Sequence, residues 1–342
     1  MSKANKVTIK TVAADAEVSV TAVSNVLRNA YGVSDAMRDK VLKSIEKLGY
    51  RPSTTARGMR GQTYTVGVLL MDILNPFVSE LVGGIQQTFE ASNYKLMFGV
   101  GRGERQIESN LIETMIDNRM DGIILVAPHL ELDRLDHLAR EVPIVLIGHH
   151  EPNSQNFDTV NVDDVEGARI ATRALFDAGH RNIRMLTLPS NNIAEFDVSF
   201  QREVGYKRAM QELGLGDAIH IVTCDLRPKT LEGADQPLPE TIRTLLHSCD
   251  KPVAYFCWSD LHAIHLLDQA RAMGLRVPDD VAVIGFDNAP NSALHSVDLA
   301  SIDQGASDLG RHAARLVLER ISGRSSPQHF LNSPRLVRRA SF

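Results

Sequence analysis

The chain has 342 residues, 43% of them hydrophobic, and a formal net charge of −5. A chain of this length and composition buries a sizeable core and divides into two or three domains, which excludes an intrinsically disordered protein. It has no run of about 18 apolar residues, as a membrane-spanning helix needs, and no apolar N-terminal stretch of the kind found in secretion signals. We therefore expect a cytoplasmic protein.

No metal or cofactor is expected. The three cysteines have no CxxC spacing, which disfavours a disulfide framework and a zinc cluster. Gly99 to Gly103 resembles a dinucleotide-binding loop, but Glu104 stands where the motif needs its third glycine. Asp260, His262 and His265 have spacings that suit a metal, yet no ligand from another segment is evident.

The first 50 residues predict three short helices. Thr8, Ser19 and Ser34 each stand at an N-cap position, where a hydroxyl accepts from the free amides of the first turn. The apolar residues that recur at helical spacing after each cap are Ile9, Val12, Ala13 and Ala16; Val23, Val26 and Leu27; and Met37, Val41, Ile45 and Leu48. The first two helices, broken at Glu17-Val18, bury these faces against each other. This pattern predicts a helix-turn-helix whose second helix enters the major groove of DNA.

Charge is unevenly distributed along the chain. Residues 1–62 contain 11 Lys and Arg and 5 acidic residues, a net charge of +6. Because the whole chain carries −5, the remainder carries −11. A basic head suits contact with phosphate, and an acidic body suits solubility.

From Tyr64 onward, short apolar runs alternate with amphipathic ones. The expected strands are 65–71, 96–100, 122–126, 143–147, 183–188, 219–223, 253–257 and 281–285. The expected helices include 78–92, 106–118, 165–178, 202–213 and 261–273. Strands buried on both faces and separated by helices indicate parallel sheets. Their number suffices for two sheets with a ligand cleft between them. The expected fold is thus an all-α helix-turn-helix head followed by a two-lobed α/β core.

Eight segments carry a resemblance that runs over the whole chain. They are VTIKTVAADAEVSVTAVSNVL, LGYRPSTTARGM, NPFVSEL, DAGHRNI, REVGYKRAM, WSDLHA, GLRVPDDVAVIGFDN and SIDQ. In this order and spacing, they resemble the lactose/galactose-repressor (LacI/GalR) family of bacterial transcription regulators.

The resemblance implies a head at 1–52, a hinge at 53–62 and a core like a periplasmic sugar-binding protein at 63–342. It divides the core into an N-lobe (63–162 and 291–322) and a C-lobe (163–290 and 323–342). Family members form homodimers that bind palindromic operators in double-stranded DNA, and a tetramer is left open.

The resemblance also implies which residues contact DNA. Val20, Thr21 and Asn25 would read base edges. Phosphate anchors would be Thr8, Ser19, Ser24 and Asn29. In the hinge, Ala56 and Met59 would contact DNA, with Met59 in the place of the leucine that wedges between base pairs in relatives.

Three departures from the family pattern concern the DNA-binding half. Asn25 stands where many relatives have arginine, so the operator sequence cannot be named. Glu17 replaces a glycine at a turn that requires positive φ, so the turn differs or is strained. Gly58 weakens the hinge helix, which is therefore expected to fold only on a suitable operator.

The family places ligand residues at strand ends. In this chain they are Asp72, Asn75, Phe77, Arg202, Trp258, Ser259, Asp260 and Asp287, with Gln304 on a crossing segment. His149 is a further candidate, because of a departure from the family pattern next to it. Carboxylates, an arginine and an aromatic face suit a sugar. Alternatively, Phe77 and Trp258 are ordinary core residues, and Asp260 is the N-cap of a helix.

A fourth departure concerns the ligand. Gly148 stands where relatives often have a ligand-binding aspartate, and it is followed by His149-His150. Losing a carboxylate and gaining imidazoles favours an anionic effector, a sugar acid or phosphosugar, with Arg202 as its anchor.

The sequence therefore predicts a non-enzymatic, nucleoid-associated repressor of carbohydrate-utilisation genes. A sugar-like effector bound between the lobes would control its operator affinity. A corepressor-dependent repressor and an activator of the same family remain alternatives. A sugar receptor without DNA function is a further alternative, against which the basic helical head counts.

Overall fold

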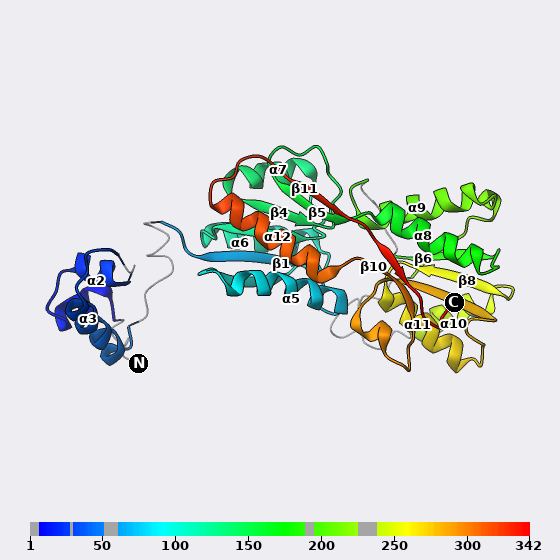
Figure 1. The fold of residues 1–342 in the computed structure, drawn as a ribbon, viewed down its shortest axis with the longest axis horizontal. Coiled ribbons are helices and arrows are strands. Elements are labelled where there is room, and N and C mark those ends of the chain that lie inside the picture. Colours follow the sequence, from blue (N-terminus) through cyan, green and yellow to red (C-terminus); the bar gives the residue numbers. More distant parts are fainter. Residues whose placement is uncertain (1–6, 28–29, 51–60, 189–194, 225–237) are drawn as a thin grey trace. The chain divides into compact units, whose positions relative to one another are not determined.

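The computed structural model describes residues 7–27, 30–50, 61–188, 195–224 and 238–342. The chain forms two compact units, Met1–Thr63 and Tyr64–Phe342, which are described separately (Figure 1). Within the described residues, no helix is both long enough and apolar enough to cross a membrane.

The first unit, the head, contains the three helices that its sequence predicts. They are α1 (Ile9–Asp15), α2 (Val20–Leu27) and α3 (Asp35–Leu48). Thr8 caps α1 in a capping box with Thr11, and the Ser19 hydroxyl accepts from the Ala22 amide at 3.0 Å. These caps accept hydrogen bonds from amides that have no partner inside the helix. Each of these two helices therefore begins directly after its capping residue.

A small apolar core holds the head together. Its buried members are Val12, Ala13, Ala16, Val23, Val26 and Val41. Ile45 and Leu48 pack against it from later turns of α3. The prediction that Met37 belongs to this core is wrong, because that side chain is 37% exposed. Met37 lies in the first turn of α3, and Val33 from the preceding loop packs on the core instead.

The second unit, the core, contains two six-stranded sheets. The first has the order β11-β5-β4-β3-β1-β2, all parallel. Its strands are β1 (Thr65–Leu70), β2 (Lys95–Val100), β3 (Gly122–Val126), β4 (Ile144–Ile147), β5 (Asp158–Val162) and β11 (His329–Asn332). We call the lobe around this sheet the N-lobe.

Helices cover both faces of the N-lobe sheet. They are α5 (Pro76–Glu90) and α12 (Ala306–Ile321) on one face, and α6 (Arg105–Asp117) and α7 (Leu132–Glu141) on the other (Figure 1). Alternate strand residues point to opposite faces: Ile124 packs with α5 and α12, and Ile123 with α6 and α7. This explains why the strands are continuous apolar runs.

The second sheet, in the C-lobe, has the order β12-β10-β9-β8-β6-β7. Its strands are β6 (Ile183–Thr187), β7 (Ile221–Thr223), β8 (Val253–Cys257), β9 (Val281–Asp287), β10 (Ala300–Asp303) and β12 (Arg335–Val337), with β12 antiparallel to β10. Its helices are α8 (Asp164–Asp177) and α9 (Val198–Glu212) on one face, and α10 (Leu238–His247) and α11 (Asp260–Ala272) on the other.

The chain passes between the lobes at three places, and two of them differ from the predicted boundaries. β10 pairs with β9, so residues 300–303 belong to the C-lobe rather than the N-lobe. β11 pairs with β5, so residues 329–332 belong to the N-lobe rather than the C-lobe. Figure 1 shows β11 continuing into β12 across the two lobes. Strands this short carry too little periodicity to be assigned to a sheet without their pairing partners.

Candidate DNA-binding face and effector pocket

The first turns of α2 carry the residues predicted to read DNA bases. Thr21 is exposed, and Asn25, one turn later, is half-buried. Val20 is also half-buried, since it packs in part against the apolar core of the head. The hydroxyls of Thr8 and Ser19 already serve as N-caps. Ser24 is half-buried within α2.

The other predicted DNA contacts, Asn29, Ala56 and Met59, lie outside the described residues, as does Gly58. The hinge predicted at 53–62 lies almost wholly outside them too, since the structure describes only its last two residues. These remain predictions of the sequence.

The turn between α1 and α2 keeps the backbone conformation that glycine would favour. Glu17 has φ +49° in the left-handed region, so its backbone is strained there. Its carboxylate accepts from Lys40 of α3 at 2.9 Å, and this hydrogen bond lowers the pKa of Glu17. Lys47 similarly donates to Asp15 at 2.7 Å. Two of the basic side chains of α3 are therefore paired with acids inside the head.

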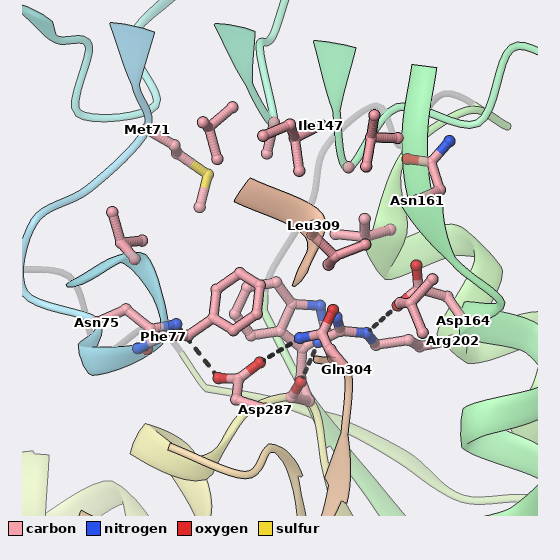
Figure 2. A pocket seen from close by; sticks show the side chains of 18 residues that line it. Met71, Asn75, Phe77, Ile147, Asn161, Asp164, Arg202, Asp287, Gln304 and Leu309 are labelled. Atoms are coloured by element: carbon pink, nitrogen blue, oxygen red, sulfur yellow. Dashed lines mark hydrogen bonds and ion pairs between the residues drawn. The ribbon is translucent and has the colours of Figure 1, made fainter. Parts of the chain in front are cut away.

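A pocket lies between the lobes, with a volume of about 620 Å³ including open solvent. Its lining residues are Met71, Asn75, Phe77, Val78, Val126, Ala127, Ile147, Gly148, Val160, Asn161, Val162, Asp164, Val198, Arg202, Trp258, Asp287, Gln304 and Leu309. Figure 2 shows Met71, Ile147 and Asn161 at the ends of N-lobe strands and Asp287 with Gln304 on the opposite side. Carboxyl ends of parallel strands thus face each other across it.

One hydrogen-bonded group in the pocket joins the two lobes. Asp287, at the end of β9, accepts from the side chain of Asn75 at 3.3 Å and from that of Gln304 at 2.6 Å (Figure 2). Asn75 is also the N-cap of α5, where its oxygen accepts from the Phe77 amide at 3.0 Å. The residues that form this Asp287 group come from the N-lobe, the C-lobe and a crossing segment, so a ligand that competes for these bonds acts on both lobes.

A second group is centred on Arg202 of α9, which is only 4% exposed. Its Nε donates to Asp164 at 2.7 Å, and its Nη1 donates to the Trp258 carbonyl. The guanidinium also lies over the Phe286 ring, 3.7 Å from its centroid. Burial opposes ionisation of Asp164, but Arg202 and a 2.8 Å contact with His150 hold its pKa below the usual value. The arginine charge is therefore balanced inside the protein.

The backbone that presents Asp287 to the pocket is strained. Asp287 has φ +127° and Asn288 has φ +52°, conformations that L-residues rarely adopt. Asp260 accepts from the Ala289 amide at 2.8 Å and from the Ser292 hydroxyl at 2.6 Å, which holds this turn. A Cβ at Gly285 would lie 2.1 Å from the Asp260 carboxylate, so the close approach requires glycine.

Four of the predicted effector residues do not line the pocket. Asp72 closes its own loop by accepting from the Leu74 amide at 2.8 Å. Ser259 is the N-cap of α11 and lies 2.8 Å from His262 Nδ1. Asp260 is buried beneath the Asp287 turn and is not the N-cap.

His149 is the fourth. Its imidazole stacks on Phe196, with 5.4 Å between ring centroids, and meets Phe157 edge-on. Burial lowers the pKa of His149 to about 4, so the ring is neutral near pH 7. His150 pairs with Asp164. Neither histidine lines the pocket, and the His149 ring is neutral, so the argument for an anionic effector loses its support from the imidazoles.

The remaining six predicted effector residues line the pocket: Asn75, Phe77, Arg202, Trp258, Asp287 and Gln304. Sequence reasoning missed Asp164, Asn161 and Val198, which line it too. The sequence could have indicated Asp164. Asp163 is the N-cap of α8 and follows the buried strand β5 directly, so Asp164 lies at a strand end, where ligand residues were expected. Val198 lies in the first turn of α9, one turn before Arg202. The helix therefore begins four residues before its predicted start at residue 202.

Within the described ranges, no group of three or more His, Cys, Asp and Glu side chains is arranged to hold a metal. The three cysteines are buried free thiols.

A helix-turn-helix head and a two-lobed α/β core with an interlobe pocket define a ligand-responsive, DNA-binding class of protein. Family models agree with both parts: "Bacterial regulatory proteins, lacI family" matches residues 8–53, and "Periplasmic binding protein-like domain" matches residues 172–342.

Whole-chain relatives identify the family. The chain is 32% identical to catabolite control protein A of Priestia megaterium, over 97% of each chain. It is 31% identical to the transcriptional repressor CytR of Escherichia coli K12, over 96% of this chain and 93% of CytR. In structure it is similar to the regulator CelR in its cellobiose complex, with TM-score 0.67, 27% identity and coverage of 98% and 100%. The chain belongs to the LacI family and is a DNA-binding transcriptional regulator.

Proposed function

We propose that this regulator is a repressor of carbohydrate-utilisation genes and that a small, neutral carbohydrate in the interlobe pocket controls its operator affinity. The observation that carries the proposal is the Asp287 group, in which side chains from both lobes and a crossing segment meet at the pocket. The solved complex of the related regulator CelR with cellobiose supports a carbohydrate.

The charge balance of the pocket supports a neutral effector over an anionic one. Arg202 is paired with Asp164, and burial raises the pKa of Asp287 to about 8, so that carboxyl is largely protonated near pH 7. Arg202 is the one Lys or Arg side chain among the residues described as lining the pocket, so a bound anion would have to compete with Asp164 for it. A polyhydroxylated ligand would instead exchange hydrogen bonds with Asp287, Asn75 and Gln304, while apolar walls such as Phe77 contact a ring face.

The proposed mechanism is a population shift between two arrangements of the lobes. Asn75 reaches Asp287 only when α5 and the end of β9 are close together. A ligand that replaces this bond favours a different arrangement of the lobes. The resulting change in operator affinity is limited by the difference between the ligand's affinities for the two arrangements. We propose that a homodimer transmits the change to two heads on a palindromic operator, where Val20, Thr21 and Asn25 read bases.

Two experiments on the full chain test the proposal. Selection from random double-stranded DNA should enrich a palindromic sequence. Affinity for that sequence is then measured with neutral sugars, sugar acids and phosphosugars. An inducing sugar should weaken binding, whereas a corepressor would strengthen it. Failure to enrich any sequence contradicts the DNA-binding half, and a response to anionic compounds alone contradicts the neutral effector.

A further inference from the structure

His149 and Phe196 form a contact between the two lobes. His149 lies two residues after β4 of the N-lobe, and Phe196 lies two residues before α9 of the C-lobe. Their rings stack with 5.4 Å between centroids and an angle of 9° between planes. The backbones meet as well, because the His150 amide donates to the Phe196 carbonyl at 2.8 Å and His149 is bridged to Asp197. Separating the lobes here requires the His149–Phe196 contact to break.

The His149–Phe196 contact adjoins the wall of the pocket on both sides. Asn161 of β5, which lines the pocket (Figure 2), accepts from the His149 amide and donates to the His149 carbonyl, both at 2.9 Å. Gly148, the residue before His149, and Val198, two residues after Phe196, also line the pocket. A change at the contact is therefore transmitted directly to the pocket wall.

The imidazole of His149 is enclosed by aromatic rings. It is 6% exposed, with Phe196 stacked on its face and Phe157 edge-on at 6.3 Å between centroids. Within the described residues, its Nδ1 has no hydrogen-bond partner. A protonated ring would place a charge there with neither water nor a partner for that nitrogen, which is costly. The contact therefore accepts the neutral imidazole and opposes the charged one.

The charged groups near His149 do not remove this opposition. Burial is the main reason why the pKa of His149 falls to about 4. His150, the next residue, lowers this pKa further, while Asp197 before α9 raises it. Phe157 and Asn161, which also contact His149, carry no charge. A ring released from Phe196 would meet water, and its pKa would return toward the ordinary value of 6.5.

We infer that His149 is a regulatory proton-binding site, and that protonation of its imidazole breaks the His149–Phe196 contact and favours an arrangement with the lobes apart. The separated arrangement binds the proton more tightly, so acid increases its population. Between pH 7 and pH 5, the ratio of separated to closed core should rise about 20-fold, from the two pKa values above. The proton then acts on the same lobe equilibrium as the carbohydrate; only the consequence for operator affinity rests on the proposed function.

Distance measurements on the full chain test the inference. Nitroxide labels are attached through ketone-bearing residues at the exposed positions Asp133 on α7 and Arg208 on α9, and double electron–electron resonance is recorded at pH 7 and pH 5. The longer distances should gain population at pH 5. His149→Phe keeps a ring for the stack but does not titrate, so it should show no gain, whereas the exposed control His137→Phe should respond as wild type. No gain in wild type, or an equal gain in His149→Phe, would overturn the inference.

A second variant separates His149 from its neighbour. His150 also joins the lobes, since its Nε2 lies 2.8 Å from the Asp164 carboxylate. His150→Gln keeps a donor for Asp164 but does not titrate, so the response to acid should persist in this variant. A response that is lost in His150→Gln and kept in His149→Phe would assign the proton to His150 and contradict the inference.

A measurement on the wild type covers the case in which His149→Phe does not fold. In the chain with ¹³C-labelled histidine, the His149 imidazole is identified by its nuclear Overhauser contacts with the Phe157 and Phe196 rings. Its pKa should lie well below 6.5 in wild type and rise toward 6.5 in Phe196→Ala. An ordinary pKa in wild type, or the same pKa in both chains, overturns the inference. None of these measurements uses DNA or a sugar, so a failure at His149 is distinguishable from a failure of the regulator function.

Discussion

The head and the core organise their polar side chains over very different distances along the chain. In the head, Thr8 caps a helix that begins one residue later, and among the described residues the ion pair with the largest sequence separation joins Asp15 to Lys47. In the core, Asp287 accepts from Asn75, 212 positions away. Local contacts build the DNA-binding element and long-range contacts build the pocket, so variants should be able to disable one and spare the other.

The largest expected effect is in the head. Val12 is fully buried, and Val12→Asp would place an unpaired carboxylate there at a cost of about 3–5 kcal/mol. A unit of about 50 residues has little more stability than this, so the head should unfold and specific DNA binding should be lost. Calorimetry should show the core transition unchanged. Ala14→Asp, at an exposed site of the same helix, serves as control, and a folded head in Val12→Asp would contradict the prediction.

Arg202→Ala should have the next largest effect, in the core. It leaves the buried carboxylate of Asp164 without its main partner, which costs about 3–5 kcal/mol of core stability. The ligand response should disappear, while operator binding persists because the head is a separate unit. Denaturant unfolding and operator titration measure both. Asp164→Ala in the Arg202→Ala background should recover part of the stability. A wild-type ligand response in Arg202→Ala would refute the site.

An effect that is smaller per pH unit concerns the core alone. Burial and the nearby Asp260 carboxylate raise the pKa of Asp287 from 3.8 to about 8. Between these values the folded state holds a proton that the unfolded state has lost, so core stability should fall as pH rises from about 4 to about 8. The slope is at most about 1.4 kcal/mol per pH unit. Unfolding free energies across this range should show a weaker decline in Asp287→Asn than in wild type. Equal declines would exclude Asp287 as the cause.

The smallest effect returns to the head. Glu17→Gly should stabilise it by about 0.5–1 kcal/mol, because glycine adopts φ +49° without the strain that Glu17 bears. Glu17→Ala is the matched control, since it also removes the exposed pair with Lys40 but keeps the strain. Thermal unfolding of the head should rank Gly above both Glu and Ala. Equal stability of Gly and Ala would show that the turn carries no strain.

Sequence reasoning anticipated most of the strands from their apolar patterns. The strand at Gly122–Val126 was predicted with its observed limits, and α5 was predicted within two residues. It missed β5 and β12, and also β10 and β11, which are four residues each. Such short segments join a sheet because a neighbouring strand offers its backbone. The paired residues are 16 positions apart for β10 and β9 and 170 positions apart for β11 and β5.

The pocket likewise combines residues that were predicted from the sequence with residues whose roles depend on distant segments. Asn75 and Asp287 were predicted from the family resemblance, which places ligand residues at strand ends. Sequence alone could not separate Asp287, which faces the pocket, from Asp260, which holds the turn beneath it. Nor could it show that His149 is buried between two aromatic rings. Burial and partner decide these roles, and both depend on side chains from other segments.

By itself, the sequence determined the helix-turn-helix, the basic head and the α/β character of the core. Each of these depends on caps, charge and periodicity within a few residues of one another. Only the tertiary structure decided which segments cross between the lobes and which polar side chains reach the pocket. It also paired Arg202 with Asp164, leaving the indole N–H of Trp258 without a partner among the described residues. The physical reason is that such contacts join residues far apart in the chain, and only the packing of the whole core selects them.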